Sequence, residues 1–270
     1  MTLIMNARMY AVTPTAEAHW RALLEGVTRA AGVTLDYRHY PAPLPLEQLW
    51  QRGDLGCVFM CGYPIALELA DVVPIAAPVL TAPWARGRAV YRADLVVRGD
   101  RGFTDLADTF GGRSGWTVRH SHSGFNAFRH HLLAYRSAER PTLYAHMEGN
   151  LVTARAVLDA VREGRIDVGP LDGYWHLLMA RHAPDLLDGI RVVASTALAP
   201  IPAFVASRGA PEGLVHALKD AFAAVASDAR YDELREELLI ERFVAVDHAD
   251  FAPTLAWDRE AVDAGYDTPA

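Results

Sequence analysis

Residues 115–126 have the sequence Gly115-Trp116-Thr117-Val118-Arg119-His120-Ser121-His122-Ser123-Gly124-Phe125-Asn126. The apolar start predicts a strand over residues 114–118, and the pattern after the polar turn predicts a helix over residues 123–135. Strand-like runs alternate with amphipathic helices in the same way along most of the chain. This alternation predicts an α/β fold in which mainly parallel sheets are covered by helices on both faces.

The polar turn has the features of an anion-binding site. Ser121 or Ser123 can cap the following helix and leave its first amide groups available. These amides, the two hydroxyls and the positive end of the helix suit a bound oxyanion. His122 can become a cation or donate as a neutral imidazole, because its ordinary pKa is about 6.5. The turn therefore predicts recognition of a phosphate-like or carboxylate group; the alternative is an ordinary helix cap without a ligand.

The alternation is interrupted by a longer β-rich run at residues 90–98 and then restarts. We therefore predict two lobes with separate sheets: residues 1–89 and 203–270 form one lobe, and residues 90–202 form the other. The chain is expected to cross near Tyr91 and again at Ala199-Pro200-Ile201-Pro202. Two crossings predict a ligand cleft between the lobes. Among the expected strands are residues 3–12, 33–40, 55–60, 142–146, 166–169 and 190–195, and among the helices residues 16–31, 150–162, 173–181, 212–227, 231–239 and 248–264.

Composition excludes several classes of partner. The 270 residues carry a net charge of −7, so nucleic acid and anionic membranes are not expected to bind the chain. No apolar run reaches the roughly 18 residues of a membrane span, so no direct membrane insertion is expected. Cys57 and Cys61 are interpreted as packed free thiols rather than a disulfide or metal pair.

Several short pieces along the chain, in the same order as in a known family, carry a resemblance. The pieces are Met9-Tyr10, Cys61-Gly62-Tyr63-Pro64, Tyr91-Arg92, Asp105-Leu106 with Gly112-Arg113, Ser121-His122-Ser123-Gly124-Phe125-Asn126, Gly149-Asn150 at the start of a helix, and Gly164-Arg165-Ile166-Asp167-Val168-Gly169-Pro170-Leu171-Asp172. With these residues, the chain resembles the phosphonate-binding branch of the type II periplasmic-binding-protein superfamily, the solute-binding components of phosphate, phosphite and phosphonate ABC importers.

The resemblance implies a two-lobed, non-enzymatic protein that clamps a small oxyanion, needs no cofactor, and delivers its ligand to an ABC permease or acts as a sensor. Tyrosines would form the walls of the cleft, and Asp172 would face the other end of the ligand, where an amino group could pair with it; Asp172 as a helix N-cap is the alternative. The residues implied in ligand binding are Ser121, His122, Ser123, Gly124, Asp172, Tyr10, Tyr63, Tyr91 and Asn150.

The sequence predicts neither a metal site nor the motifs of a serine hydrolase or a nucleotide-binding protein. His120, His122, His130 and His131 lack an acid or cysteine at ligand spacing, so no metal site is predicted. The Ser-His-Ser-Gly turn is not a G-x-S-x-G elbow, and no phosphate-binding G-x-x-x-x-G-K-[ST] loop is present.

The N-terminus does not look like a signal peptide, whereas the family resemblance implies a periplasmic protein. Both locations, periplasmic and cytoplasmic, therefore stay open. The alternative function is a leaderless enzyme on the same fold, similar to those of menaquinone or thiamine-pyrimidine biosynthesis. In that case His122 would be the acid/base and Asp172 its partner.

Overall fold

The chain folds into two units, which the computed structural model describes over residues 2–211 and 213–270. The first unit contains the chain up to Val90, together with Leu177–Ala183 and Pro200–Ala252. The second unit contains Tyr91–His176, Pro184–Ala199 and Pro253–Ala270. None of the described helices combines the length and apolar character needed to cross a bilayer.

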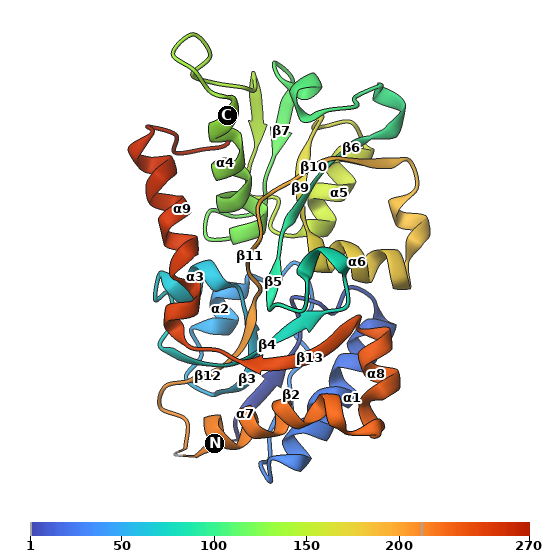
Figure 1. Cartoon of the computed structure of the whole chain (residues 1–270), viewed down its shortest axis with the longest axis vertical. Coiled ribbons are helices and arrows are strands. Elements are labelled where there is room, and N and C mark those ends of the chain that lie inside the picture. Colours follow the sequence, from blue (N-terminus) through green and yellow to red (C-terminus); the bar gives the residue numbers. More distant parts are fainter. Residues whose placement is uncertain (1, 212) are drawn as a thin grey trace. The chain divides into compact units, whose positions relative to one another are not determined.

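A mixed six-stranded sheet forms the centre of the first unit (Figure 1). Its strands are β1 (Ile4–Asn6), β2 (Asp36–Tyr37), β3 (Leu55–Met60), β4 (Val72–Leu80), β12 (Ala203–Ser207) and β13 (Ile240–Ala245). Their order is β13-β4-β12-β3-β1-β2. β1 is parallel to β2 and β3, whereas β12 is antiparallel to β3 and β4, and β13 is antiparallel to β4.

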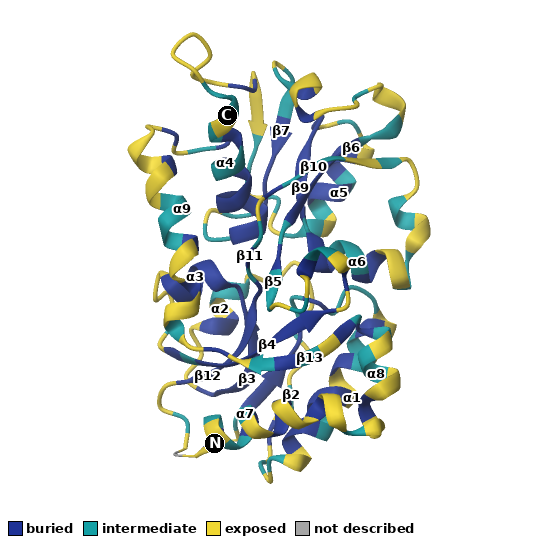
Figure 2. Ribbon diagram, viewed as in Figure 1, coloured by how far each residue is buried: buried dark blue, intermediate teal, exposed yellow. Residues whose placement is uncertain are grey.

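An aromatic cluster joins this sheet to its helices. Phe204 on β12 stacks on Phe59 of β3 at 3.8 Å between ring centroids and on Phe222 at 5.0 Å. Trp20 meets the edge of Phe59 at 5.0 Å. All four rings are fully buried, and Figure 2 shows β3 and β12 as buried and the outer surfaces of the helices as exposed. The helices are α1 (Pro14–Ala30), α2 (Leu46–Trp50), α3 (Gly62–Ala66), α7 (Leu214–Ala224) and α8 (Asp232–Glu237).

The second unit contains two smaller sheets. β10, β6 and β9 form an antiparallel sheet with β6 in the middle, and β7 pairs in parallel with β8. α5 packs on β9 and β6, and α4 packs on β6. Leu95, Phe128 and Val168 lie in the buried core. The elements are β6 (Ala93–Arg98), β7 (Arg113–Gly115), β8 (His146–Glu148), β9 (Gly169–Asp172), β10 (Ile190–Ser195), α4 (Ala127–Leu132) and α5 (Ala154–Arg162).

The chain crosses between the units near the two predicted places and at three more. β5 (Val90–Tyr91) and β11 (Ala199–Pro200) pair with each other where the sequence predicts the crossings. In addition, α6 (Gly173–His182) begins in the second unit and ends in the first, the chain returns to the second unit after Ala183, and α9 (Ala252–Asp263) leads into the second unit. Residues 253–270 therefore belong to the second unit and not to the lobe predicted for them.

Hydrogen bonds explain why the C-terminal segment belongs to the second unit. The Ser114 hydroxyl donates to the Pro269 carbonyl at 3.0 Å, and the Leu143 amide donates to the Ala270 carbonyl at 2.8 Å. Ser114 is fully buried, so its hydroxyl needs such a partner. These contacts join residues more than one hundred positions apart, which the local sequence pattern does not reveal.

The α/β fold is confirmed, but the sheets are mixed rather than mainly parallel, because β12 and β13 return from the later part of the chain. The strand predicted at residues 3–12 ends at Asn6, since the Tyr10 and Ala11 amides donate to the Ala7 carbonyl and form a turn. The strands predicted at 142–146 and 166–169 begin four and three residues later, as β8 and β9.

The helices fit the prediction better than the strands do. The Thr13 hydroxyl accepts from the Ala16 amide at 3.1 Å, and Pro14 opens α1, a position where its missing N–H costs nothing. The helix predicted from Asn150 starts instead at Ala154, because Asn150 and Val152 have φ angles of 56° and 67° and Thr153 caps the helix. The start predicted at residue 212 lies outside the described residues.

Phe204→Ala should lower the free energy of unfolding of the first unit by about 3–5 kcal/mol, because it removes a fully buried ring and leaves a cavity between Phe59 and Phe222. Urea denaturation followed by tryptophan fluorescence measures this loss. Leu44→Ala is the control, since that side chain is exposed and its loss should change the value by less than about 0.5 kcal/mol. Equal effects of the two substitutions would contradict this description of the core.

Candidate functional site

The turn predicted to bind an anion is a single π-helical turn over His122–Asn126, followed directly by α4. The Asn126 amide donates to the Ser121 carbonyl at 3.0 Å. The Ser121 side chain accepts from the Gly124 amide at 3.0 Å and is therefore the helix cap. Ser123 lies in the first turn of this segment, where a helix leaves its amides without a partner inside the helix. π-turns of this kind inside helices occur frequently at functional sites.

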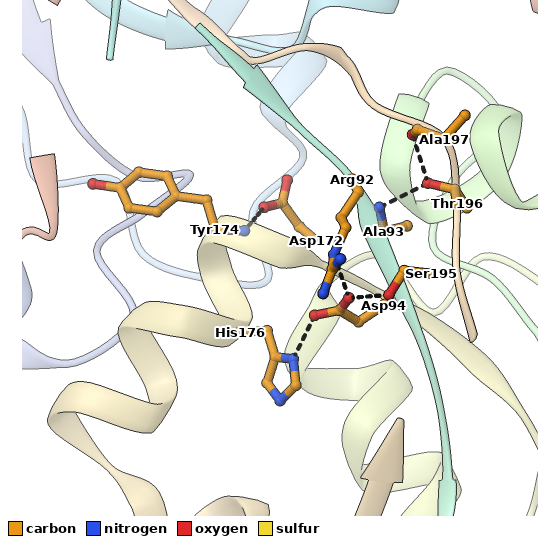
Figure 3. A network of polar contacts seen from close by, with 9 residues as sticks. All are labelled: Arg92, Ala93, Asp94, Asp172, Tyr174, His176, Ser195, Thr196 and Ala197. Atoms are coloured by element: carbon orange, nitrogen blue, oxygen red, sulfur yellow. Dashed lines mark hydrogen bonds and ion pairs between the residues drawn. The ribbon is translucent and has the colours of Figure 1, made fainter. Parts of the chain in front are cut away.

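Ser123 and Asp172 lie side by side. The Ser123 hydroxyl donates to Asp172 Oδ2 at 3.2 Å. Asp172 Oδ1 accepts from the amide of Tyr174 at 3.0 Å (Figure 3). It also accepts from the amide of Trp175 at 3.0 Å, and so caps α6. The helix-cap interpretation of Asp172 is thus confirmed, and the carboxylate adjoins the serine turn. Its contact with a ligand stays a prediction.

Gly124 lies against Thr117 with no room for a side chain. A Cβ atom at Gly124 would be 2.0 Å from Thr117 Oγ1 and 2.9 Å from Ser121 Oγ. The Thr117 amide donates to the Gly124 carbonyl at 3.1 Å. Thr117 is 6 % exposed, and its hydroxyl oxygen has no hydrogen-bond partner among the described residues. The sequence analysis missed Thr117, which lies within the strand predicted at residues 114–118, four residues before Ser121.

His122 is completely buried. Burial lowers its pKa to about 3, and the charge of His130 acts in the same direction. The Asn126 side-chain amide lies 3.3 Å from Nδ1, and the imidazole ring lies 5.1 Å from the ring of Trp257 and 6.1 Å from that of Tyr91. His122 is therefore a neutral imidazole at ordinary pH, which does not favour the acid/base role of the alternative enzyme function.

Residues of the C-terminal segment form hydrogen bonds and an ion pair with the turn and with α4. The Asn126 side-chain Nδ2 donates to the Thr254 carbonyl at 2.8 Å, and its side-chain Oδ1 accepts from Arg129 Nη2 at 3.2 Å. Arg129 is buried and forms an ion pair with Asp258 on α9. The positive charge of Arg129 is thus neutralised by a protein carboxylate at this position.

The remaining predicted residues fall in different places. Tyr91 is buried near His122 in the second unit. Asn150 is exposed in the loop after β8, next to Leu151, whose amide donates to the Trp116 carbonyl at 3.2 Å. Tyr10 and Tyr63 are buried in the first unit, and Tyr10 meets the edge of Phe59 at 5.1 Å.

A second polar network on β6 resembles a catalytic triad in composition but not in geometry. Asp94 accepts from Ser195 at 2.7 Å and from Arg92 at 3.0 Å, and its Oδ2 lies 2.9 Å from His176 Nδ1 (Figure 3). Burial alone would raise the pKa of Asp94, but His176, Ser195 and Arg92 hold this pKa below its usual value. Ser195 donates to the carboxylate and not to the imidazole, so no base activates the hydroxyl.

Gly124→Ala should lower the free energy of unfolding of the second unit by about 1–3 kcal/mol, because the new methyl group meets the Thr117 hydroxyl. Adding Thr117→Ala should restore part of this loss, and a double-mutant cycle of denaturation curves measures the coupling. Gly209→Ala is the control, since a Cβ there meets nothing within 4 Å. If the effects of Gly124→Ala and Thr117→Ala on the free energy of unfolding are strictly additive, the two residues do not make the close contact described.

The burial of His122 predicts a pH dependence of stability. The folded state resists protonation down to about pH 3, whereas the unfolded state takes up a proton near pH 6.5. Between these values stability falls as the pH falls, by up to about 1.4 kcal/mol per pH unit. Urea denaturation between pH 6 and pH 4 should show a steeper fall for the wild type than for His122→Phe. The exposed-site variant His146→Ala should follow the wild type, and parallel curves for all three would refute the buried neutral imidazole.

Comparison with solved structures identifies similar folds. A binding protein of an ABC phosphonate transporter from Pseudomonas aeruginosa has a TM-score of 0.79 and 15% identity, with 98% of this chain and 88% of that chain covered. PhnD1 from Prochlorococcus marinus, in complex with methylphosphonate, has a TM-score of 0.77 and 13% identity, with 97% and 98% covered. The aliphatic sulphonate binding protein SsuA from Escherichia coli has a TM-score of 0.60 and 14% identity, with 97% and 87% covered. No curated protein sequence matches the chain.

Comparison with protein families is decisive for the assignment. The family described as the periplasmic substrate-binding protein of phosphonate ABC transporters matches residues 11–251, which is most of the chain. Both the predicted family and the prediction of a binding protein rather than an enzyme are confirmed by this match. The chain belongs to the family of periplasmic substrate-binding proteins of phosphonate ABC transporters.

Proposed function

We propose that the chain binds a small phosphonate-like oxyanion through neutral hydrogen-bond donors of the Ser121–Gly124 turn and Thr117. The ligand would then pass to an ABC permease. PhnD1 holds methylphosphonate, and SsuA binds aliphatic sulphonates, which are also tetrahedral oxyanions. These ligands support the same ligand class for this chain.

The observation that carries this proposal is the buried Thr117 hydroxyl, which has no hydrogen-bond partner among the described residues. Such a group costs stability unless a ligand or water satisfies it. Thr117 Oγ1 and Ser121 Oγ both face the α-carbon of Gly124. The Ser123 amide follows in the same turn, at the positive end of the helical segment that continues through α4. A phosphonate oxygen is a suitable acceptor for this group of donors.

Asp172 restricts which anions suit the turn. Its carboxylate receives the Ser123 hydroxyl at 3.2 Å and would repel a dianion placed at the same hydroxyl. A singly charged anion is repelled less than a dianion, and a ligand with an ammonium group offers Asp172 a counter-charge. We therefore propose aminoalkylphosphonates as the ligands that suit the turn best, in preference to free phosphate.

Thr117→Val and Ser123→Ala should each weaken methylphosphonate binding by about 10-fold or more, because a hydrogen bond to a charged group contributes about 1.5–3 kcal/mol. Isothermal titration calorimetry with methylphosphonate, 2-aminoethylphosphonate, phosphate and sulfate measures the affinities. Ser137→Ala is the control, since this exposed serine bonds only to its neighbourhood at Glu139 and Arg140.

Two results would count against the proposal. If the wild-type chain binds none of the four anions, the proposed function is wrong. If anions bind but Thr117→Val and Ser123→Ala behave like Ser137→Ala, the ligand lies elsewhere on the chain. Circular dichroism of each variant verifies that its fold is retained.

A further inference from the structure

Three metal-ligating side chains from three helices meet in the first unit. His19 lies on α1, and His182 and Glu237 are the last residues of α6 and α8. One ligand atom from each side chain lies within 4.8 Å of the other two. The segment Leu177–Ala183, which carries His182, belongs to the first unit together with α1 and α8. Within the described residues, no other group of three such side chains is this close together.

The hydrogen bonds of His182 set its tautomer. Nε2 lies 2.9 Å from the backbone carbonyl oxygen of Glu237, which can only accept, so Nε2 carries the proton. In the neutral ring, Nδ1 then has a lone pair, and it lies 4.0 Å from Glu237 Oε2. A histidine that donates one ring N–H to a backbone carbonyl and keeps the lone pair of its other nitrogen for the ion is typical of metal sites.

His19 provides an independent observation. Its Nδ1 atom is buried and has no hydrogen-bond partner among the described residues. The His19 ring lies 5.8 Å from the His182 ring, with an angle of 48° between the two planes. A buried ring nitrogen without a partner requires an explanation in a native protein. A cation between the two rings and the carboxylate would supply it.

Arg181 and the dipole of α6 act on the carboxylate of Glu237 and on the position of the proposed ion. Arg181 Nη2 donates to Glu237 Oε1 at 2.6 Å, which leaves Oε2 on the side of His182. His182 stands at the C-terminal end of the ten-residue helix α6, where the helix dipole favours a positive charge.

We propose that His19, His182 and Glu237 bind a divalent transition-metal ion, with Zn²⁺ as the probe. Two imidazoles and one carboxylate are a known donor set for zinc with water in the fourth position. Tetrahedral zinc needs about 3.3 Å between ligand atoms, so the present separations require side-chain shifts of about 1 Å. Imidazole ligands disfavour Mg²⁺ and Ca²⁺, which prefer oxygen.

The ion would join the end of α6 to α1 and α8. Since α6 begins in the second unit and ends in the first, the metal would fix the last turn of this crossing helix to the first unit. This role is separate from anion binding, because no ligand atom belongs to the Ser121–Gly124 turn or to Thr117.

The test is a titration of the full, tag-free chain with ZnCl₂ after removal of metals with a chelator. Isothermal titration calorimetry should show one saturable site, and His19→Ala and Glu237→Gln should each weaken it at least 10-fold. Glu237→Gln keeps an oxygen that can accept from Arg181. His216→Ala is the matched control, because this exposed histidine of the first unit faces only Asp220 and its loss should leave the affinity unchanged. MgCl₂ should give no comparable binding.

Thermal unfolding gives a second measurement of zinc binding. Zn²⁺ at about 100 times its dissociation constant should raise the unfolding temperature of the wild type and of His216→Ala but not of His19→Ala. Absence of a saturable site in the wild type overturns the proposal. So does an affinity within twofold of the wild type in either His19→Ala or Glu237→Gln. Methylphosphonate titrations of the same folded variants measure anion binding separately. Loss of zinc binding can thereby be distinguished from a failure of the proposed phosphonate-binding function.

Discussion

The local structure of the anion-binding candidate depends on the carboxylate of Asp172. One oxygen caps α6 through two amides, and the other receives the Ser123 hydroxyl. Asp172 is also the last residue of β9, which pairs with Ala93 on β6. A single side chain therefore connects the sheet, the start of α6 and the serine turn. Its removal would leave two helix amides and a buried serine without their acceptor, which makes an uncharged replacement other than asparagine costly.

Burial also determines what His122 contributes to the turn. A histidine in an anion-binding turn is most useful as a cation, but burial keeps His122 neutral. Its ring packs near Tyr91 and Trp257, so it contributes shape and rigidity rather than charge. Asn126 links it to the C-terminal segment through the Thr254 carbonyl. The turn is thus preorganised by contacts on its protein side, which leaves fewer degrees of freedom to order when a ligand binds.

The sequence predicted local features well and distant contacts poorly. β3 and β10 match the predicted bounds, and Ser121 is a helix cap as expected, because apolar runs and capping residues act over a few positions. Asn150 was wrongly taken as the start of a helix, since nothing local shows that Asn150 and Val152 adopt positive φ angles. β13 was missed because an edge strand with Glu241 and Arg242 lacks a continuous apolar run. His19, His182 and Glu237 come together only after α1, α6 and α8 have packed.

The net charge of the chain and the ion pairs of its arginines limit how it can bind an anion. The chain carries a net charge of −7, and screening at physiological ionic strength limits attraction between exposed charges to about 8 Å. Arg129 and Arg92 are already neutralised by Asp258 and Asp94. Arg119 lies against the rings of Trp116 and Phe125. The proposed site would therefore bind an anion mainly through neutral donors at hydrogen-bond distance. Neutral donors in a buried site discriminate by position and number, so selectivity among tetrahedral anions would depend on where Thr117, Ser123 and Asp172 stand rather than on the strength of a positive field.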